Sequence, residues 1–142
     1  MADSFDPAYF NELLKYSENN QNSIKQISSY MYYHRETYHE VATKLWKEKF
    51  DSSEDINIKF TLINILHEIL VISAKKKRIE YISSFSEVLE QVMFKFSEEC
   101  QSLELLLNVF EILAIWNLIM VYSRTFLLEV IKPISEKVLF FY

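Results

Sequence analysis

The stretch that decides the fold reads INIKFTLINILHEILVIS, residues 56–73, and it has a counterpart in LELLLNVFEILAIWNLIMVY, residues 103–122. Apolar residues recur at helical spacing through both segments, so each is predicted to form one long helix. Each helix also carries a thin polar stripe whose steps of three and four residues place it on one face. The stripes are Asn57, Thr61, Asn64 and Glu68 in the first helix, and Glu104, Asn108 and Glu111, continued by Ile115 and by Leu118 or Ile119, in the second.

A helix that is apolar nearly all round is typical of a protein core, so a polar stripe on it marks the strip that reaches water, a partner or a ligand. We therefore predict that the two stripes form the walls of one groove that holds a peptide. Residues 103–122 approach the length of a membrane span, but Glu104 and Glu111 interrupt them, and the charge-free part, residues 112–122, is too short to cross a bilayer. The expectation is a buried core helix.

The rest of the chain is also predicted to be helical. There is no glycine, so the Asn-Gly and Asp-Gly turns that hairpins favour are absent. The expected fold is all-α, a right-handed superhelix of about eight helices. Asp6 should cap a helix that begins at Pro7, and Pro133 should end the last long helix. The expected helices cover about 7–16, 23–33, 36–50, 56–73, 79–96 with a break at Ser83-Ser84, 103–122 and 123–132.

The expected core follows from the helical spacing, and Trp46 and Trp116 are predicted to be its anchors. The other residues expected to face inward before residue 56 are Tyr9, Phe10, Leu13, Leu14, Ile24, Ile27, Met31, Tyr38, Val41, Ala42 and Leu45.

Length and charge set the first bounds on function. With 142 residues the chain suits one domain, predicted as 1–132, and a tail, 133–142, that can add a short packing helix. A net charge of −5 argues against a general nucleic-acid binder. The single cysteine, Cys100, excludes an intrachain disulfide and favours a reducing compartment. The first ten residues lack the pattern of a signal peptide.

Composition also argues against catalysis. Without glycine there is no standard P-loop, dinucleotide fingerprint, nucleophile elbow or EF-hand loop. One cysteine excludes zinc sites built on paired cysteines, and His34 and His39 do not have the i, i+4 spacing of a helical ligand pair. No pattern nominates a catalytic pair of carboxylates. We therefore expect neither an enzyme nor a metal or cofactor site.

The order of several motifs resembles the CTD-interacting domain family, closest to the subgroup that regulates nuclear pre-mRNA. The resemblance runs from about Phe10 to Lys132. It is carried by NNQNSI (19–24), His34-Arg35, TKLWKE (43–48), KFTLINILHEI (59–69), and ILAIW (112–116) followed by Val121, Tyr122 and Phe126. It implies a nuclear adaptor that binds the heptad-repeat tail of RNA polymerase II and links transcription to termination or RNA 3′-end processing. It further implies a monomer or weak homo-oligomer, with no direct binding of nucleic acid or membrane.

The resemblance also assigns positions in a peptide site. Glu68 stands where the family has an aspartate that accepts a hydrogen bond from the peptide tyrosine. Glu111 stands where many members have an arginine that pairs with phosphoserine, so the phosphate-reading signature is altered or lost. The remaining matched or groove-facing positions are Asn19, Asn64, His67, Ile115 and Ile119.

Basic residues offer possible phosphate contacts at Lys75, Lys76 and Arg78, in the basic run after residue 73, and at Arg124. The alternative for this run is favourable charge at a helix C-terminus, or ordinary solvated lysines.

Two other functions remain open. VHS and ENTH domains, which are trafficking adaptors that bind sorting peptides or lipid, share the expected architecture. Asp3 and Asp6, with no lysine or arginine in residues 1–10, count against an ENTH-like lipid binder, while the apolar end of the second stripe, Ile115 to Ile119, suits a different hydrophobic peptide. A structural scaffold that associates through the apolar tail, residues 138–142, is the third possibility.

Overall fold

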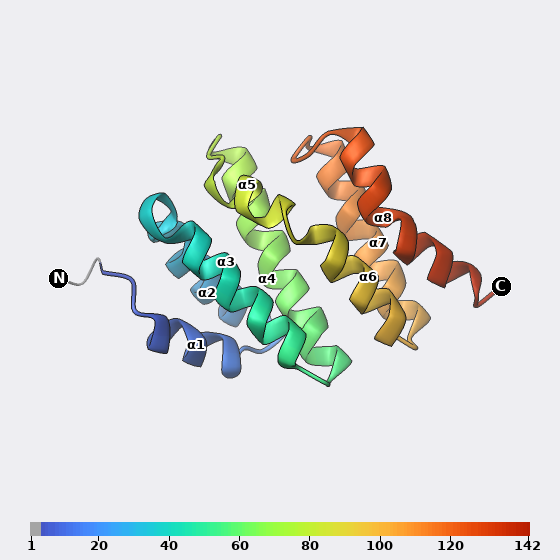
Figure 1. Ribbon diagram of the computed structural model, residues 1–142, viewed down its shortest axis with the longest axis horizontal. Coiled ribbons are helices and arrows are strands. Elements are labelled where there is room, and N and C mark those ends of the chain that lie inside the picture. The colour runs from blue at the N-terminus through green and yellow to red at the C-terminus, as the bar shows by residue number, and fades with distance from the viewer. Residues whose placement is uncertain (1–3) are drawn as a thin grey trace. The chain divides into compact units, whose positions relative to one another are not determined.

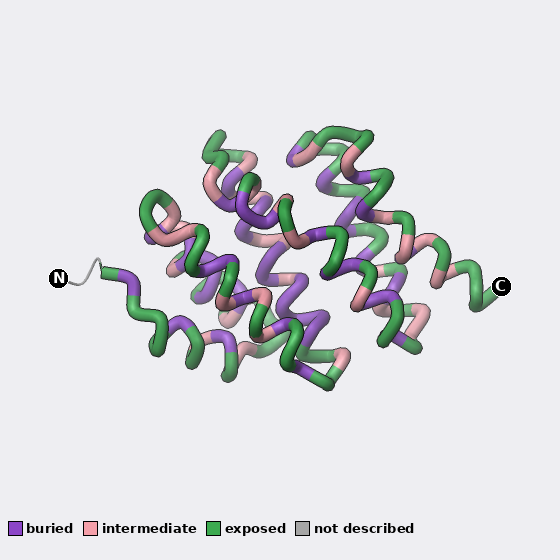
Figure 2. The backbone as a smooth tube through the Cα atoms, in the orientation of Figure 1, coloured by how far each residue is buried: buried purple, intermediate pink, exposed green. Residues whose placement is uncertain are grey.

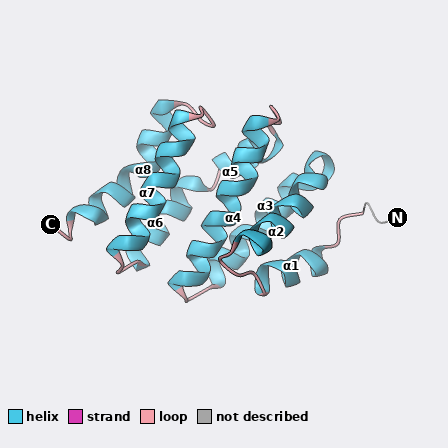
Figure 3. Cartoon of the chain, turned by 180° about the vertical axis from the view of Figure 1, so that it is seen from behind, coloured by secondary structure: helices cyan, strands magenta, loops and turns pink. Residues whose placement is uncertain are grey.

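The computed structural model describes residues 4–142, so Asp3 lies outside the described residues. Within them the chain forms eight helices and no strand, which confirms the predicted all-α fold (Figures 1 and 3). Short loops join consecutive helices. The helices are α1 (Pro7–Lys15), α2 (Gln21–Tyr33), α3 (Arg35–Ser52), α4 (Ile56–Lys75), α5 (Glu80–Ser86), α6 (Leu89–Glu99), α7 (Leu103–Leu118) and α8 (Arg124–Leu139).

The chain divides into two compact units between Phe85 and Ser86. In the first unit α2 packs along α4, while α3 contacts α1, α2 and α4. In the second unit α8 packs against both α6 and α7. The predicted boundary between domain 1–132 and its tail falls inside α8.

Helix α4 is the central helix of the first unit. Asp55 begins it by accepting a hydrogen bond from the Asn57 amide at 2.8 Å, as its place before the apolar run predicts. Half of the residues of α4 are buried, and they are purple in Figure 2. By length and hydropathy α4 could cross a membrane, but 56% of its most apolar stretch is buried inside the protein, as in an ordinary core helix.

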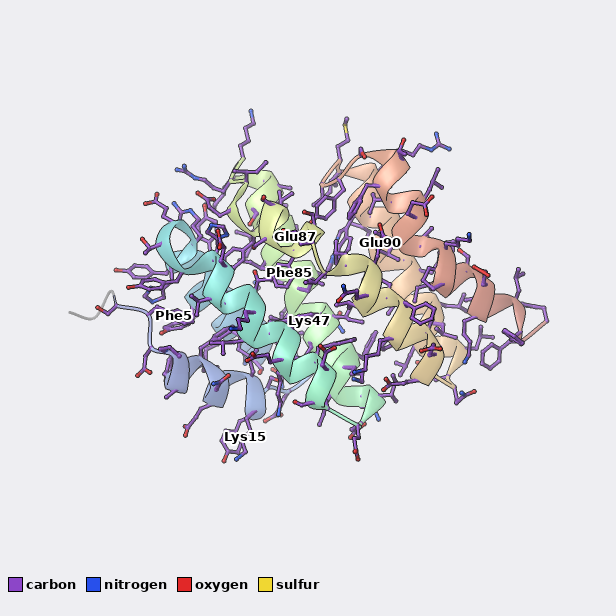
Figure 4. The ribbon with its side chains drawn as sticks, in the orientation of Figure 1. Phe5, Lys15, Lys47, Phe85, Glu87 and Glu90 are labelled. Atoms are coloured by element: carbon purple, nitrogen blue, oxygen red, sulfur yellow. The ribbon has the colours of Figure 1, made fainter. Side chains whose placement is uncertain are left out.

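Polar contacts from α4 to its neighbours fix its position. Lys59 is fully buried, donates from Nζ to the carbonyl of Phe50 at 2.6 Å and lies over the Phe50 ring. Trp46 donates from Nε1 to the carbonyl of Leu62 at 2.9 Å and packs edge-on against Phe85, labelled in Figure 4. These contacts join the second half of α3 to the first two turns of α4, and Trp46 also links α3 to the last turn of α5.

Aromatic packing holds the corner between α2 and α3. The ring of Phe5, labelled in Figure 4, contacts those of Tyr30, His34 and Tyr38. The backbone amide of Asp6 donates to the Tyr30 hydroxyl at 2.9 Å. Phe5 and Asp6, which precede α1, therefore pack against the corner that carries Arg35 and hold it in place.

Two helices end with a residue in the left-handed conformation although the chain has no glycine. Lys77 follows α4 with φ of 58°, and Met120 follows α7 with φ of 61°. In both, the next amide bonds back across the turn: Arg78 to the Ser73 carbonyl, and Val121 to that of Trp116. This is the Schellman arrangement, in which glycine normally avoids the steric penalty.

Three predicted helix limits are wrong. The break expected at Ser83-Ser84 lies at Glu87 and Val88, because Ser84 is buried and bonds to the Thr43 hydroxyl at 2.8 Å. Pro133 does not end the last helix, since α8 continues to Leu139. The helix predicted over residues 103–122 ends at Leu118, where the turn through Met120 begins.

Val130 and Ile134 flank Pro133 and are both fully buried, so packing outweighs the hydrogen bond that a proline removes from a helix interior. The tail that could have added a separate helix is, as far as Leu139, the last part of α8.

The core contains both tryptophans, as predicted, and each is fully buried. The prediction that Tyr9 and Val41 face the core is wrong, because Tyr9 is 46% exposed and Val41 is 41% exposed. The second long helix is less buried than expected: α7 buries one face, through Val109, Leu113 and Trp116, and its exposed face extends beyond the predicted stripe to Leu107 and Phe110.

Candidate functional site

The strip on α4 consists of Asn64, His67 and Glu68, all half-buried, and continues through the half-buried Ile72. Thr61 was expected in this strip but is only 7% exposed, and its hydroxyl donates to the carbonyl of Asn57 at 3.0 Å. The usable strip therefore begins at Asn64. His67 and Glu68 lie three and four residues after Asn64, so the three polar side chains reach the surface on one helical face.

Each polar group of this strip has a defined chemical character. The Asn64 side-chain amide donates to the carbonyl of Phe60 at 3.1 Å, which orients its oxygen. Burial lowers the pKa of His67 below its ordinary 6.5, and the neighbouring Glu68 carboxylate opposes this only in part. At neutral pH the strip thus presents the neutral imidazole of His67 next to the carboxylate of Glu68. This carboxylate can accept a hydrogen bond from a hydroxyl group.

The strip on α7 lies on the solvent side of that helix, as predicted. Glu104, Glu111, Ile115 and Ile119 are exposed, and Asn108 is half-buried. It begins acidic and ends apolar, with Leu118 80% exposed beside it. Such a surface attracts an apolar side chain at one end and repels an anion at the other.

The two strips belong to different units, Asn64 to Glu68 in the first and Glu111 to Ile119 in the second. Helix α4 brings its three residues together, and α7 does the same for Glu111, Ile115 and Ile119. That both strips form one groove stays a prediction. Asn19 is exposed in the turn before α2, and its neighbour Asn20 caps that helix by accepting from the Ser23 amide at 2.9 Å.

The basic residues lie at helix ends. Lys75 is the last residue of α4, Lys76 follows it, and Arg78 closes the turn. Arg124 is exposed at the first position of α8.

Sequence reasoning missed the contribution of Arg35. This residue lies with Lys76 beside the ring of Tyr32. The spacing of Tyr32 and Arg35 by three residues at a helix end is the signal that could have found the pair.

No group of three or more His, Cys, Asp and Glu side chains is placed to hold a metal ion in residues 4–142. Cys100 is buried, and burial raises the pKa of its thiol. Its sulfur contacts the carbonyl of Ser102 at 3.4 Å. This thiol therefore has the character of a packing group.

No curated protein matches this chain. The family model for the CID domain matches residues 8–130, which takes in α1 to α7 and the first part of α8. It also includes both candidate strips. The chain therefore belongs to the CID domain family.

Proposed function

We propose that this domain binds the heptad-repeat tail of RNA polymerase II through the strips on α4 and α7. CID domains are protein-interaction domains that bind this tail, and they are not an enzyme family. The observation that carries the assignment is the half-buried carboxylate of Glu68 beside a neutral His67, on a helix whose first two turns are tied to α3. This carboxylate accepts the tyrosine hydroxyl of the peptide, flanked by Asn64 and His67.

The proposal extends to the cellular role. Binding of the polymerase tail places the protein in the nucleus, where it links transcription to termination or to RNA 3′-end processing. It acts as an adaptor, as a monomer or weak homo-oligomer, and this domain contacts neither nucleic acid nor membrane. Asn19 contributes from the turn before α2, and Ile115 and Ile119 contribute an apolar contact.

The phosphate reading of this domain differs from that of relatives with an arginine on α7. Glu111 is exposed on the peptide strip, so it opposes a phosphate on the serine directly after the tyrosine. Unmodified peptide therefore binds at least as well as peptide phosphorylated there.

One observation supports a second candidate, a trafficking adaptor that binds sorting peptides. Ile115, Leu118 and Ile119 expose apolar surface at the end of the α7 strip, which suits a leucine-containing signal. Acidic sorting signals, however, would meet Glu104 and Glu111 on the same helix face. The apolar tail at and after the end of α8, with Phe140 and Tyr142 exposed, would instead serve self-association.

The test is a pair of substitutions at Glu68, titrated with a two-heptad tail peptide carrying a fluorophore. A hydrogen bond to a charged acceptor contributes about 1.5–3 kcal/mol, so Glu68→Ala should weaken binding roughly ten-fold or more. Glu68→Gln keeps the size and an acceptor oxygen but not the charge, and it should fall between wild type and alanine. Unchanged affinity in Glu68→Ala, with unchanged circular dichroism, would remove Glu68 from the site.

A further inference from the structure

A groove runs between α6 and α8, entirely within the second unit, where these two helices pack along each other (Figure 1). Its volume is about 760 Å³. All of its lining residues belong to α6, to α8 or to Phe140, which directly follows α8. The groove is therefore formed by other helices than the two peptide strips, and the proposed function leaves it without a role.

The apolar residues of this groove are open to water. Phe94 is 55% exposed, Phe140 is 84% exposed, and Pro133 is half-buried. One exposed phenylalanine is ordinary on a protein surface. Two phenylalanines and a proline that line the same depression form an apolar surface that a partner can remove from water as a unit.

The length of the groove suits a short helix laid along it. From Glu90 to Glu98 helix α6 rises about 12 Å, and from Glu129 to Phe140 the chain rises about 16 Å, at roughly 1.5 Å per residue. Nζ of Lys137 donates to the carbonyl of Glu98 at 3.4 Å, so the last turns of α6 and α8 meet. An extended peptide would bring unpaired N–H and C=O groups against apolar side chains, whereas a helix pairs most of its own.

The lining of the groove carries an excess of negative charge. Its four glutamates and two lysines leave a net charge of −2, and they are Glu90, Glu98, Glu129, Glu136, Lys132 and Lys137. No ion pair joins these side chains within residues 4–142. Both lysines are on α8, so the charged residues that α6 contributes are acidic only. The α6 side of the groove therefore attracts cations.

Pro133 adds a hydrogen-bond acceptor to the same surface. A proline has no N–H, so the carbonyl of Glu129, four residues earlier in α8, lacks its helical hydrogen bond. Both Glu129 and Pro133 line the groove. Water can pair this carbonyl in the free protein, and a partner that displaces the water has to bring a donor. Lysine and arginine side chains are such donors.

A second copy of this chain is the competing occupant, and charge argues against it. Two copies that meet groove to groove would bring together two surfaces of net negative charge, which repel each other. The basic run at residues 75–78 contains no apolar side chain to fill the groove of another copy. The occupant that fits both the apolar lining and the charge is a basic segment of a different protein.

We propose that the α6–α8 groove binds a basic amphipathic helix of a partner protein. Apolar side chains of this helix pack against Phe94, Pro133 and Phe140. Its lysine or arginine residues follow the edge that faces Glu90 and Glu98. The domain thus has a second docking surface, which is independent of the peptide that the strips on α4 and α7 bind. An adaptor uses such a surface to hold one partner while it holds another.

The test titrates the whole chain with a fluorescent model helix of about four turns, roughly 14 residues, with leucine at helical spacing and lysine elsewhere. The same peptide with glutamate in place of lysine is the charge control, and it should bind at least about ten-fold more weakly. In ¹H–¹⁵N NMR spectra the lysine peptide should shift the amides of Glu90, Phe94, Glu129 and Glu136. These shifts should follow one dissociation constant.

Two pairs of variants separate this groove from general attraction to an acidic protein. Phe94→Ser should weaken binding of the lysine peptide roughly ten-fold or more. Leu128→Ser should not change it, because Leu128 is 59% exposed on α8 but does not line the groove. Glu90→Lys should weaken binding at least about three-fold. Glu87→Lys makes the same charge change at an exposed site outside the lining, labelled with Glu90 in Figure 4, and should weaken it less than about two-fold.

Binding that shifts the α6 and α8 amides and is lost in Phe94→Ser, with an unchanged urea midpoint, supports the proposal. No binding of the lysine peptide, equal binding of the glutamate peptide, equal effects within either pair of variants, or shifts centred on the α7 strip would overturn it. A dimer in sedimentation equilibrium that Phe94→Ser abolishes would also overturn it, because a second copy would then fill the groove. Phe94→Ser should leave the affinity for tail peptide unchanged, so this proposal and the proposed function fail independently.

Discussion

Glu111→Arg should create a preference for tail peptide phosphorylated on the serine directly after its tyrosine. In the proposed complex the carboxylate of Glu111, which is exposed on α7, faces that position. Arginine reverses the charge and adds a fork that can bind two phosphate oxygens. The wild-type protein should bind this phosphopeptide no more tightly than the unmodified one, and the variant should bind it more tightly.

The size of the effect follows from the exposure of Glu111. In water a single charge and a phosphate with two charges, about 5 Å apart, interact with roughly 1.7 kcal/mol, and physiological salt reduces this to about 1 kcal/mol. Changing repulsion into attraction of similar size shifts the preference by about 2 kcal/mol, or roughly 30-fold in the ratio of the two dissociation constants.

Fluorescence anisotropy with both peptides, at low and at physiological salt, measures this ratio. The effect should shrink as salt rises, because an exposed pair is screened. Glu90→Arg makes the same charge change at an exposed site on α6, labelled in Figure 4, and should leave the ratio unchanged. A wild-type protein that already prefers this phosphopeptide ten-fold, or a Glu111→Arg ratio equal to that of Glu90→Arg, would refute the reasoning.

Three further predictions concern stability. Trp116→Ala should lower the free energy of unfolding by roughly 3–5 kcal/mol, because the ring is fully buried; a loss under about 1 kcal/mol in urea denaturation would contradict its place in the core. Burial lowers the pKa of His67 below the 6.5 of the unfolded chain, so the unfolded state takes up the proton first. Stability should therefore fall as pH drops through 6.5, and His67→Gln should flatten that part of the profile. Met120→Gly should stabilise by about 0.5–1 kcal/mol, since glycine relieves the left-handed strain and loses part of the gain to chain entropy; an unchanged midpoint would mean that the turn is unstrained.

The helical spacing of apolar residues was sufficient to predict the helices. Capping residues were sufficient to predict where several of them begin. Asp6, Asp55 and Ser123 each accept a backbone hydrogen bond at the start of a helix. The errors arose where packing between helices outweighs local preference. Pro133 is tolerated because its neighbours are buried, and Ser84 serves as a buried hydrogen-bonding residue where a break was expected.

The candidate site was predictable where it follows one helix. The stripe periodicity placed Asn64 and Glu68 on the surface of α4, and Glu111 and Ile115 on that of α7. It failed at Thr61, which is buried between the exposed Asn57 and the half-buried Asn64, and whose hydroxyl donates to the Asn57 carbonyl. The stripe periodicity could not predict that Arg35 and Lys76 lie together, since these residues are 41 positions apart and meet only through the packing of α2 on α4.

The central claim is that the strips on α4 and α7 bind one tail peptide together. The most direct measurement is an NMR titration of ¹⁵N-labelled protein with unmodified two-heptad peptide, and with an acidic dileucine peptide as the competing class. The amides of Asn64, His67 and Glu68 and those of Glu111, Ile115 and Ile119 should shift with one common dissociation constant, and only for the tail peptide. Shifts confined to one strip, different constants for the two, or a stronger response to the dileucine peptide would contradict the claim.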